Sequence, residues 1–364
     1  NAKVIVGGQI ISRVTPEQFK RLFGSTGAIQ IASAKDLEPL FGKVPLPYEV
    51  SLVSVFEQMG RRLYEYLLWE FPLWLSQGCA YNCGEYCSAE RNQLEQHHDL
   101  KMFREGVEFL ILYAKSRGIK SLSCYASSLD FFQNPTIVAE YLEVLADLRA
   151  KYKFHFRVRA LSCLKTFLKA SEVLPDFGAL LEWSGFWRVG FGVDGSGEAE
   201  WKRQGKVQNK TGDVGKSLDL CKEIGLQAEV IMVTAFTTST IGQLARTVYN
   251  SYGYLWRWRS VKLRPYHAKP VLPGNNGWQR ETATVEKLLA NPKLFYNLEF
   301  NCLGSSITNP NWFMRWLGNI SYLLLIAGPA LFGRSISFPL LPQGAKGLYG
   351  RFAKWWNNKM PIVD

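Results

Sequence analysis

Three cysteines lie close together in the first quarter of the chain, at Cys79, Cys83 and Cys87. Their spacing fits a single loop wrapped around a compact inorganic core. A mononuclear zinc site would be one ligand short, because the loop has no fourth cysteine and no histidine. A cubane iron–sulfur cluster normally takes four thiolates, so three leave one iron open for a substrate or cosubstrate. The spacing therefore predicts an iron–sulfur centre in a reducing, cytoplasmic compartment.

The other cysteines and the nearest histidines have plainer interpretations. Cys124, Cys163, Cys221 and Cys302 are dispersed, and free cysteines are mostly small buried hydrophobes. The histidine pair at residues 97–98 follows the loop and is interpreted as a pair on the surface of a helix. The three clustered cysteines are therefore the candidate metal ligands.

The composition bounds the class of protein. The 364 residues include 43 lysines and arginines against 31 aspartates and glutamates, and 47% are hydrophobic. This ordinary globular profile excludes a disordered chain, a coiled coil and a disulfide-stapled miniprotein. The net charge of +12 favours an anionic partner such as nucleic acid, phospholipid head groups or an acidic small molecule.

A repeating architecture begins near residue 73, where short apolar runs alternate with amphipathic helices. Expected strands are 121–125, 154–160, 187–193, 228–234 and 261–266, and expected helices are 135–151, 164–173, 213–224 and 241–252. Strands that alternate with helices of this length indicate βαβ units and a parallel sheet. Five or six such units can curl into a full or partial barrel, with its chemistry at the carboxyl ends of the strands.

The cysteine loop and the residues after it, roughly 73–303, resemble the radical S-adenosylmethionine (SAM) superfamily. The usual signature has three cysteines with gaps of three and two residues, and an aromatic residue before the last. Here Gly78 precedes Cys79 and Tyr86 precedes Cys87, while the second gap holds three residues. Residues 191–196 with Lys206, and residues 221–226 with 230–233, are similar to the fourth and fifth barrel units.

The resemblance implies a [4Fe-4S] cluster whose open iron binds SAM, and an external donor that supplies one electron. The cleaved sulfonium then yields a 5′-deoxyadenosyl radical that takes hydrogen from an unactivated carbon. The family's usual Gly-Gly-Glu stretch, which meets the amino group of SAM, corresponds to residues 125–130, where no glycine or glutamate stands. The SAM-binding residues expected from the resemblance are Tyr86, Ser127, Ser128, Arg159 and Asp194. For Arg159 and Asp194 a buried ion pair is the alternative.

The N-terminal residues have a narrower resemblance, to the last third of the cobalamin-binding domain that precedes many radical SAM enzymes. Gly7 and Gly8 follow a short strand and match the glycine pair that lets the backbone approach the cofactor. The Asp-x-His-x-x-Gly loop of that family does not occur in the sequence. Residues 1–45 are expected to be this Rossmann-like fragment, with the chain starting within the domain. Residues 46–72 are expected to be a linker. A vestigial cap without cobalamin is the alternative.

The C-terminal residues 304–364 form an apolar, tryptophan-rich extension. Four tryptophans lie there, together with six basic residues and one acid in 311–364. The uncharged stretch between Arg315 and Arg334 is a poor membrane span, because it is short and carries polar residues and Pro329. Two interpretations remain open: a helix that lies on a membrane surface through tryptophan anchors and basic flanks, and a helix packed on the body of the protein.

A second basic and aromatic cluster begins at residues 256–259, Trp-Arg-Trp-Arg, and continues to His267 and Lys269. Rings that stack on bases, with cations on phosphates, would suit nucleic acid. The same composition suits a flat, anionic or lipid-like substrate at a barrel mouth. Because His267 and Lys269 follow a strand, a substrate loop is favoured over a nucleic-acid platform.

The sequence thus predicts an α/β protein: a partial (β/α)6 radical-SAM-type barrel, preceded by a Rossmann-like fragment and followed by the C-terminal extension. Its predicted function is cleavage of SAM and activation of a C–H bond in a small hydrophobic, anionic or membrane-proximal substrate, with methyl transfer as a candidate outcome. The alternative is a degenerate relative that serves as a structural subunit of a larger membrane complex. The altered cysteine spacing and the replaced Gly-Gly-Glu stretch favour that alternative.

Overall fold

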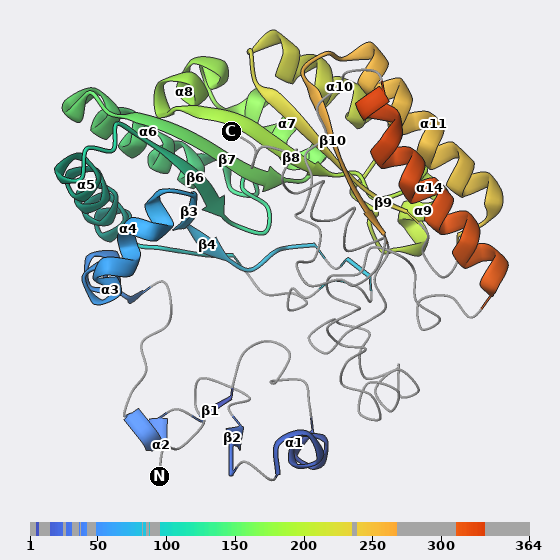
Figure 1. Cartoon of the computed structure of the whole chain (residues 1–364). Coiled ribbons are helices and arrows are strands. Elements are labelled where there is room, and N and C mark those ends of the chain that lie inside the picture. The colour runs from blue at the N-terminus through green and yellow to red at the C-terminus, as the bar shows by residue number, and fades with distance from the viewer. Residues whose placement is uncertain are drawn as a thin grey trace.

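A six-stranded parallel sheet forms the centre of the molecule (Figure 1). The computed structural model describes residues 5–6, 15–24, 27–30, 36, 38–41, 49–81, 83–84, 87, 95–234, 239–267 and 311–331. The strands are β3 (Glu70–Trp74), β6 (Ser121–Ser127), β7 (His155–Ser162), β8 (Phe186–Gly192), β9 (Gln227–Thr234) and β10 (Val261–His267). They are ordered β10-β9-β8-β7-β6-β3, and every neighbouring pair is parallel.

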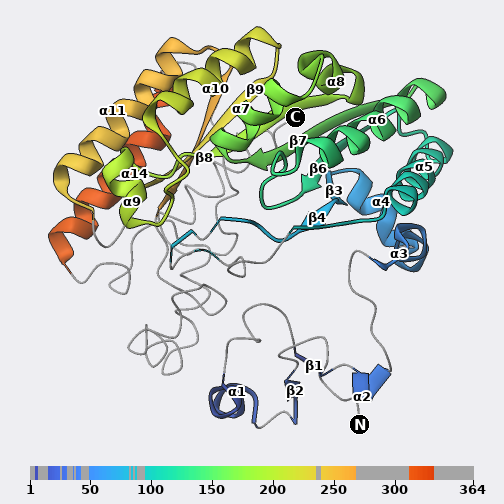
Figure 2. The ribbon, with the colours of Figure 1, turned by 180° about the vertical axis from the view of Figure 1, so that it is seen from behind.

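Helices cover one face of this sheet, as the two opposite views make clear (Figures 1 and 2). They are α5 (Leu100–Ser116), α6 (Pro135–Tyr152), α7 (Leu164–Val173), α8 (Phe177–Ser184), α10 (Thr211–Glu223) and α11 (Ile241–Arg257), while the short α9 (Glu198–Arg203) follows β8. Parallel strands need crossover connections, and helices on the sheet face provide them. The predicted α/β fold with a partial barrel of six strands is confirmed.

The strands alternate between two environments. In β7, Phe156, Val158 and Ala160 are buried under the helices, whereas Arg157 and Arg159 between them are only half-buried. Successive side chains of a strand point to opposite faces, so one face of the sheet is apolar and the other is polar. The apolar face joins the helices in one continuous hydrophobic core.

The segment expected to be a linker, 46–72, contains two helices in its described part. These are α3 (Leu52–Met59) and α4 (Arg61–Leu67), and the sheet begins at Glu70, ahead of the expected start of the barrel. Leu52, Phe56 and Leu63 are buried in the core. The segment therefore differs from a linker, because its apolar side chains cover the edge of the helical layer.

The described N-terminal part pairs β1 (Ile5–Val6) in parallel with β2 (Ile29–Gln30). Between them lies α1 (Pro16–Phe23), which begins at a capping box: Gln18 N donates to Thr15 Oγ1, and Thr15 N donates to Gln18 Oε1. The short α2 (Glu38–Phe41) follows. Gly7 and Gly8 lie outside the described residues, so their predicted role stays a prediction.

The described part of the C-terminal extension is a single helix, α14 (Trp312–Leu331), which packs beside α11 and β10 (Figures 1 and 2). Tyr322 and Leu325 are buried, and Ser321 Oγ lies 3.0 Å from Thr234 Oγ1. This is the packed-helix interpretation. Within the described ranges, no helix is long and apolar enough to cross a membrane. Contact of 304–364 with a membrane surface stays a prediction.

Substitution of Gly106 tests the packing of α3 on α5. An added Cβ there would lie 2.6 Å from Leu52 Cβ, closer than real Cβ atoms approach one another. We expect Gly106→Ala to lower the free energy of unfolding by about 1–3 kcal/mol, because the two helices must separate. Urea denaturation followed by circular dichroism measures this loss.

Gly253 in α11 is the matched control, because an added Cβ there meets nothing within 4 Å. Gly253→Ala should stabilise the protein by about 0.5–1 kcal/mol through the helix propensity of alanine. Equal effects of the two substitutions would contradict close packing of α3 on α5.

Candidate functional site

The cysteine loop leaves and returns at the carboxyl edge of the sheet. After β3, the Leu75 amide donates to Ser127 O at the end of β6, at 3.3 Å. The two-residue strand β4 (Ser76–Gln77) then pairs antiparallel with β5 (Gln96–His97). Residues 78–95 therefore form an excursion whose two ends are held side by side. This edge is where parallel α/β folds gather their chemistry.

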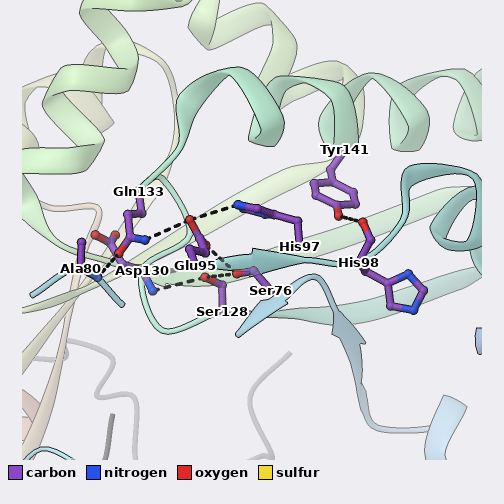
Figure 3. Close-up of polar contacts among 9 residues, drawn as sticks. All are labelled: Ser76, Ala80, Glu95, His97, His98, Ser128, Asp130, Gln133 and Tyr141. Carbon is purple, nitrogen blue, oxygen red and sulfur yellow. Dashed lines mark hydrogen bonds and ion pairs between the residues drawn. The ribbon is translucent and has the colours of Figure 1, made fainter. Parts of the chain in front are cut away.

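Glu95 ties the two ends of this excursion together (Figure 3). Its carboxylate accepts hydrogen bonds from Ser76 Oγ at 2.6 Å and from Gln133 Nε2 at 3.1 Å, and lies 3.3 Å from His97 Nε2. Gln133 in turn accepts a bond from the Ala80 amide at 2.8 Å. The residue next to Cys79 is thereby fixed to the segment that follows β6.

Ser128 belongs to the same network. Its Oγ lies within hydrogen-bond distance of Ser76 Oγ, at 2.9 Å, and accepts a hydrogen bond from the Asp130 amide at 3.3 Å, and the side chain is buried. Ser127 is the last residue of β6 and is half-buried. The structure thus brings both serines to the carboxyl end of β6, beside the cysteine loop. Their binding of SAM stays a prediction.

Asp130 is a buried carboxylate, and its hydrogen bonds all go to one of its two oxygens. Its Oδ1 accepts hydrogen bonds from Ser162 Oγ, the Cys163 amide and Thr166 Oγ1, at 2.7–2.9 Å. Its Oδ2 is buried and has no partner among the described residues. Burial raises the pKa of this carboxyl, although the three hydrogen bonds oppose the shift.

The middle of the cysteine loop docks on the segment after β8. The Gly84 amide donates to Gln204 O at 2.7 Å, and Gln208 Nε2 donates to Cys83 Sγ at 3.4 Å. A Cβ at position 84 would lie 2.3 Å from Gln204 O, so only glycine permits this approach. Two segments more than a hundred residues apart in sequence therefore share one site.

A buried ion pair lies behind this contact. Lys206 Nζ is paired with Asp194 Oδ2 and is 3.3 Å from Gly192 O, at the end of β8. Asn209 Nδ2 donates to the same carbonyl at 3.0 Å. Asp194 was expected either to bind SAM or to form a buried ion pair, and the ion pair is present. Its Oδ1 has no partner within the described ranges.

The surroundings of the thiols differ along the loop. The pKa of Cys83 is lowered to about 6, chiefly by a hydrogen bond from Cys87 and further by Gln208 and the Lys206 charge. Burial raises the pKa of Cys79 to about 11. Among the described residues, no group of three or more His, Cys, Asp or Glu side chains is placed to hold a metal ion. Three thiols on one loop beside a buried lysine nevertheless fit the donor chemistry of an iron–sulfur cluster.

Arg159 was expected either to bind SAM or to form an ion pair, and the ion pair is present in the structure. Its guanidinium is paired with the Glu70 carboxylate through two nitrogens, and Nη1 lies 3.9 Å from Glu229 Oε2. It also lies over the Tyr125 ring, 4.7 Å from the centroid. Its binding of SAM stays a prediction.

Three predicted site residues lack a described side chain. Tyr86 and Lys269 lie outside the described residues. His267 is the last residue of β10, and its side chain lies outside the described part. The substrate loop after β10 therefore stays a prediction.

The interpretation of the histidine pair was wrong. His97 lies in β5, and His98 is buried, with Nε2 3.0 Å from Val50 O. Tyr141 Oη donates to His98 O (Figure 3). Both residues therefore belong to the anchor of the cysteine loop rather than to a helix surface. Of the dispersed cysteines, Cys124 and Cys221 are fully buried, as expected.

The basic and aromatic cluster at 256–259 is divided by the fold. Trp256 is 81% exposed, whereas Trp258 is buried and donates from Nε1 to Asp219 Oδ1 at 2.7 Å. Arg257 lies over the Trp258 ring, 4.6 Å from the centroid, and 3.9 Å from Asp219. A continuous stacking platform is therefore not formed by these residues.

Several residues of the site carried no motif in the sequence. Glu95, Gln133, Gln204 and Gln208 hold the cysteine loop, yet none lies within the matched signature. Gly84 gave the best available signal, because a glycine between two candidate ligands often marks close backbone approach. The polar residues could be recognised only after folding had placed them.

The fold is that of the radical SAM enzymes. The cobalamin-dependent radical SAM enzyme OxsB, with aqua-cobalamin and SAM bound, is similar with a TM-score of 0.51 and 14% identity over 91% of this chain and 48% of its own. For OxsB with aqua-cobalamin alone, the TM-score is 0.50 and the identity 15%, over 80% of this chain and 43% of OxsB. The resemblance expected from the cysteine loop is thus confirmed at the level of the fold.

The radical SAM methyltransferase TsrM from Kitasatospora setae, with cobalamin and a [4Fe-4S] cluster bound, is also similar, with a TM-score of 0.47 and 15% identity over 60% of this chain and 38% of its own. The chain spans less than half the length of these proteins. No protein-family model and no curated protein sequence matches it.

Gly84→Ala should release the cysteine loop from the segment after β8. The added Cβ cannot fit against Gln204 O, so the Gly84 hydrogen bond and the contact of Gln208 with Cys83 are both lost. We expect amide exchange in residues 79–87 to become at least tenfold faster, measured by hydrogen–deuterium exchange with mass spectrometry. Gly212→Ala, where an added Cβ meets nothing within 4 Å, should leave this exchange unchanged.

Glu95→Ala should destabilise the anchor of the loop. The Ser76 hydroxyl and the Gln133 amide would lose their shared acceptor, at a cost of about 1–3 kcal/mol in the free energy of unfolding. Urea denaturation measures the loss. The control is Glu105→Ala, an exposed carboxylate on α5, which should change stability by less than about 0.5 kcal/mol. Equal losses would contradict the anchoring role of Glu95.

Proposed function

We propose that the chain is a radical SAM enzyme that holds a [4Fe-4S] cluster on Cys79, Cys83 and Cys87. The observation that carries the proposal is the position of these thiols. All three lie on one loop, which is anchored at the carboxyl edge of a six-stranded parallel sheet. The likeness of the fold to OxsB supports it. When bound, the cluster would pass an electron from an external donor to SAM, whose cleavage yields the radical that activates a C–H bond.

The chain's own residues prepare one thiol of this loop, Cys83, to carry negative charge. The buried Lys206 ammonium lies near the thiols and lowers the pKa of Cys83, and Gln208 donates to the same sulfur. Cys79 is buried, so water has little access to that side of the loop. A thiol with a lowered pKa, such as Cys83, is ready to bind metal as the thiolate, and exclusion of water protects a radical from quenching.

We propose that SAM binds between the loop and the ends of β6 and β8. Ser127, Ser128 and Asp194 are at those ends. Asp130 Oδ2 and Asp194 Oδ1, which have no partner among the described residues, are acceptors for a ligand's donors. Tyr86 would contact the adenine. Arg159 is the weaker candidate for the carboxylate of SAM, because Glu70 already occupies its guanidinium.

The finer parts of the proposal concern the substrate and a second cofactor. We propose a small hydrophobic, anionic or membrane-proximal substrate, positioned by His267 and Lys269. Gly7 and Gly8 would meet cobalamin, and methyl transfer would then be the outcome. OxsB is a cobalamin-dependent enzyme and TsrM a methyltransferase. These similarities of fold motivate the proposed cofactor and reaction, and they say nothing of the substrate.

Anaerobic reconstitution of the full chain with iron and sulfide tests the cluster. We expect about four iron atoms per chain and the broad visible absorption of a [4Fe-4S] cluster. Cys83→Ala should remove most of both signals. Cys221→Ala is the matched control, because this thiol is buried in α10 away from the loop, and it should keep them.

Reduction of the reconstituted protein in the presence of SAM tests the reaction. Formation of 5′-deoxyadenosine, at a rate lowered at least a hundredfold in Cys83→Ala, is the expected result. Additional S-adenosylhomocysteine would support methyl transfer. An intact cluster that yields neither product would overturn the proposal in favour of a structural subunit.

A further inference from the structure

Charged side chains gather on the face of the sheet opposite the helices. Five cations and two carboxylates from five strands form this arginine cluster: Glu70, Arg157, Arg159, Arg188, Glu229, Lys262 and Arg264. Their mutual contacts place them on one face, because Arg159 reaches both Glu70 and Glu229, and Arg264 Nη1 lies 3.5 Å from Glu229 Oε2. Cations outnumber acids in this cluster, and two of its members, Arg188 and Glu229, are buried.

An irregularity in β8 builds the centre of the cluster. In the register with β7, Val158 pairs with Phe186 and Arg159 with Arg188, so Trp187 is an extra residue without a partner. Such a bulge re-aims side chains at a chosen point of a sheet. Here two guanidiniums lie over the Trp187 ring, with Arg157 Cζ at 4.2 Å and Arg188 Cζ at 3.9 Å from its centroid.

Arg188 is the most deeply buried cation of the cluster. Its side chain is only 4% exposed, and Nε donates to Gln227 Oε1, a neutral amide, at 2.6 Å. The two carboxylates of the cluster make their contacts with Arg159 and Arg264 instead. Burial lowers the pKa of Arg188 to about 10, which reflects the cost of keeping this charge out of water.

Three buried donors of this region have no acceptor among the described residues: Arg188 Nη2, Trp187 Nε1 and Arg264 Nε. Buried N–H groups are nearly always satisfied in native proteins, by protein, water or a ligand. A buried guanidinium with an unused N–H group has the charge and the donor that recognise an oxyanion.

We propose that the arginine cluster binds an oxyanion, the phosphate or carboxylate group of a small anionic ligand, with Arg188 as its main partner. Trp187 holds the guanidinium in place by stacking, and Lys262 adds positive charge at the margin of the site. The proposal does not depend on iron, SAM or radical chemistry, so it can fail or succeed separately from the function proposed above.

The test measures anion binding by the full chain as purified. Inorganic phosphate and acetate are titrated at constant ionic strength, with sodium chloride as the balancing salt, and the shift of the melting temperature and the heat of binding are recorded. We expect a saturable stabilisation by phosphate or acetate, and at least a tenfold weaker Kd in Arg188→Gln. Preference for phosphate would indicate a phosphorylated ligand, and preference for acetate a carboxylic acid.

Arg104→Gln is the matched control. It removes the same charge from α5 on the helical layer, where Arg104 pairs with Asp147 at 3.3 Å, and it should leave the Kd within twofold of wild type. Should Arg188→Gln not fold, Lys262→Gln provides the second variant, with at least threefold weaker binding expected. No saturable effect in wild type, or equal affinity in all variants, would overturn the proposal.

Discussion

The antiparallel pairing of β4 with β5 holds both ends of the cysteine loop at one edge of the sheet, and the candidate site depends on it. A loop of this length would otherwise sample many conformations, and ordering it costs entropy. Two residues of strand cannot supply this order alone. Glu95 adds the missing constraint, because one carboxylate joins the strand before the loop, the histidine after it and the segment that follows β6.

The far side of the loop is constrained by backbone rather than by side-chain packing. Gly84 meets the Gln204 carbonyl in direct contact, which brings Cys83 beside Gln208 and the Lys206 ammonium. Burial of the Lys206 ammonium would be unfavourable on its own. The ion pair with Asp194 offsets part of this cost. Negative charge on Cys83 therefore compensates this ammonium. Electrostatics and loop geometry therefore favour the same ligand chemistry, an anionic metal cluster.

Much of the fold was predictable from the sequence, and the reason is local periodicity. The strands at 121–127 and 227–234 and the helix at 135–152 are regular runs whose pattern survives folding. Helix α5, whose N-cap is Asp99, was not among the predicted helices, and the histidine pair just before it was wrongly expected to lie on a helix. Glu95 and Gln133 could not be predicted, because their contact joins irregular segments 38 residues apart. Such contacts follow from tertiary placement, which no local pattern encodes.

The same limit applies to the arginine cluster. Taken one at a time in the sequence, its residues look like solvent-facing positions of amphipathic strands. Only sheet register and the bulge at Trp187 bring them together. Arg188 and Gly192 are four residues apart on β8, so about 13 Å of strand separates the anion site from the carboxyl edge that carries the thiols. The two proposals together therefore limit the substrate: a molecule bound at both places must be extended, with its anionic group at the far end from the carbon that reacts.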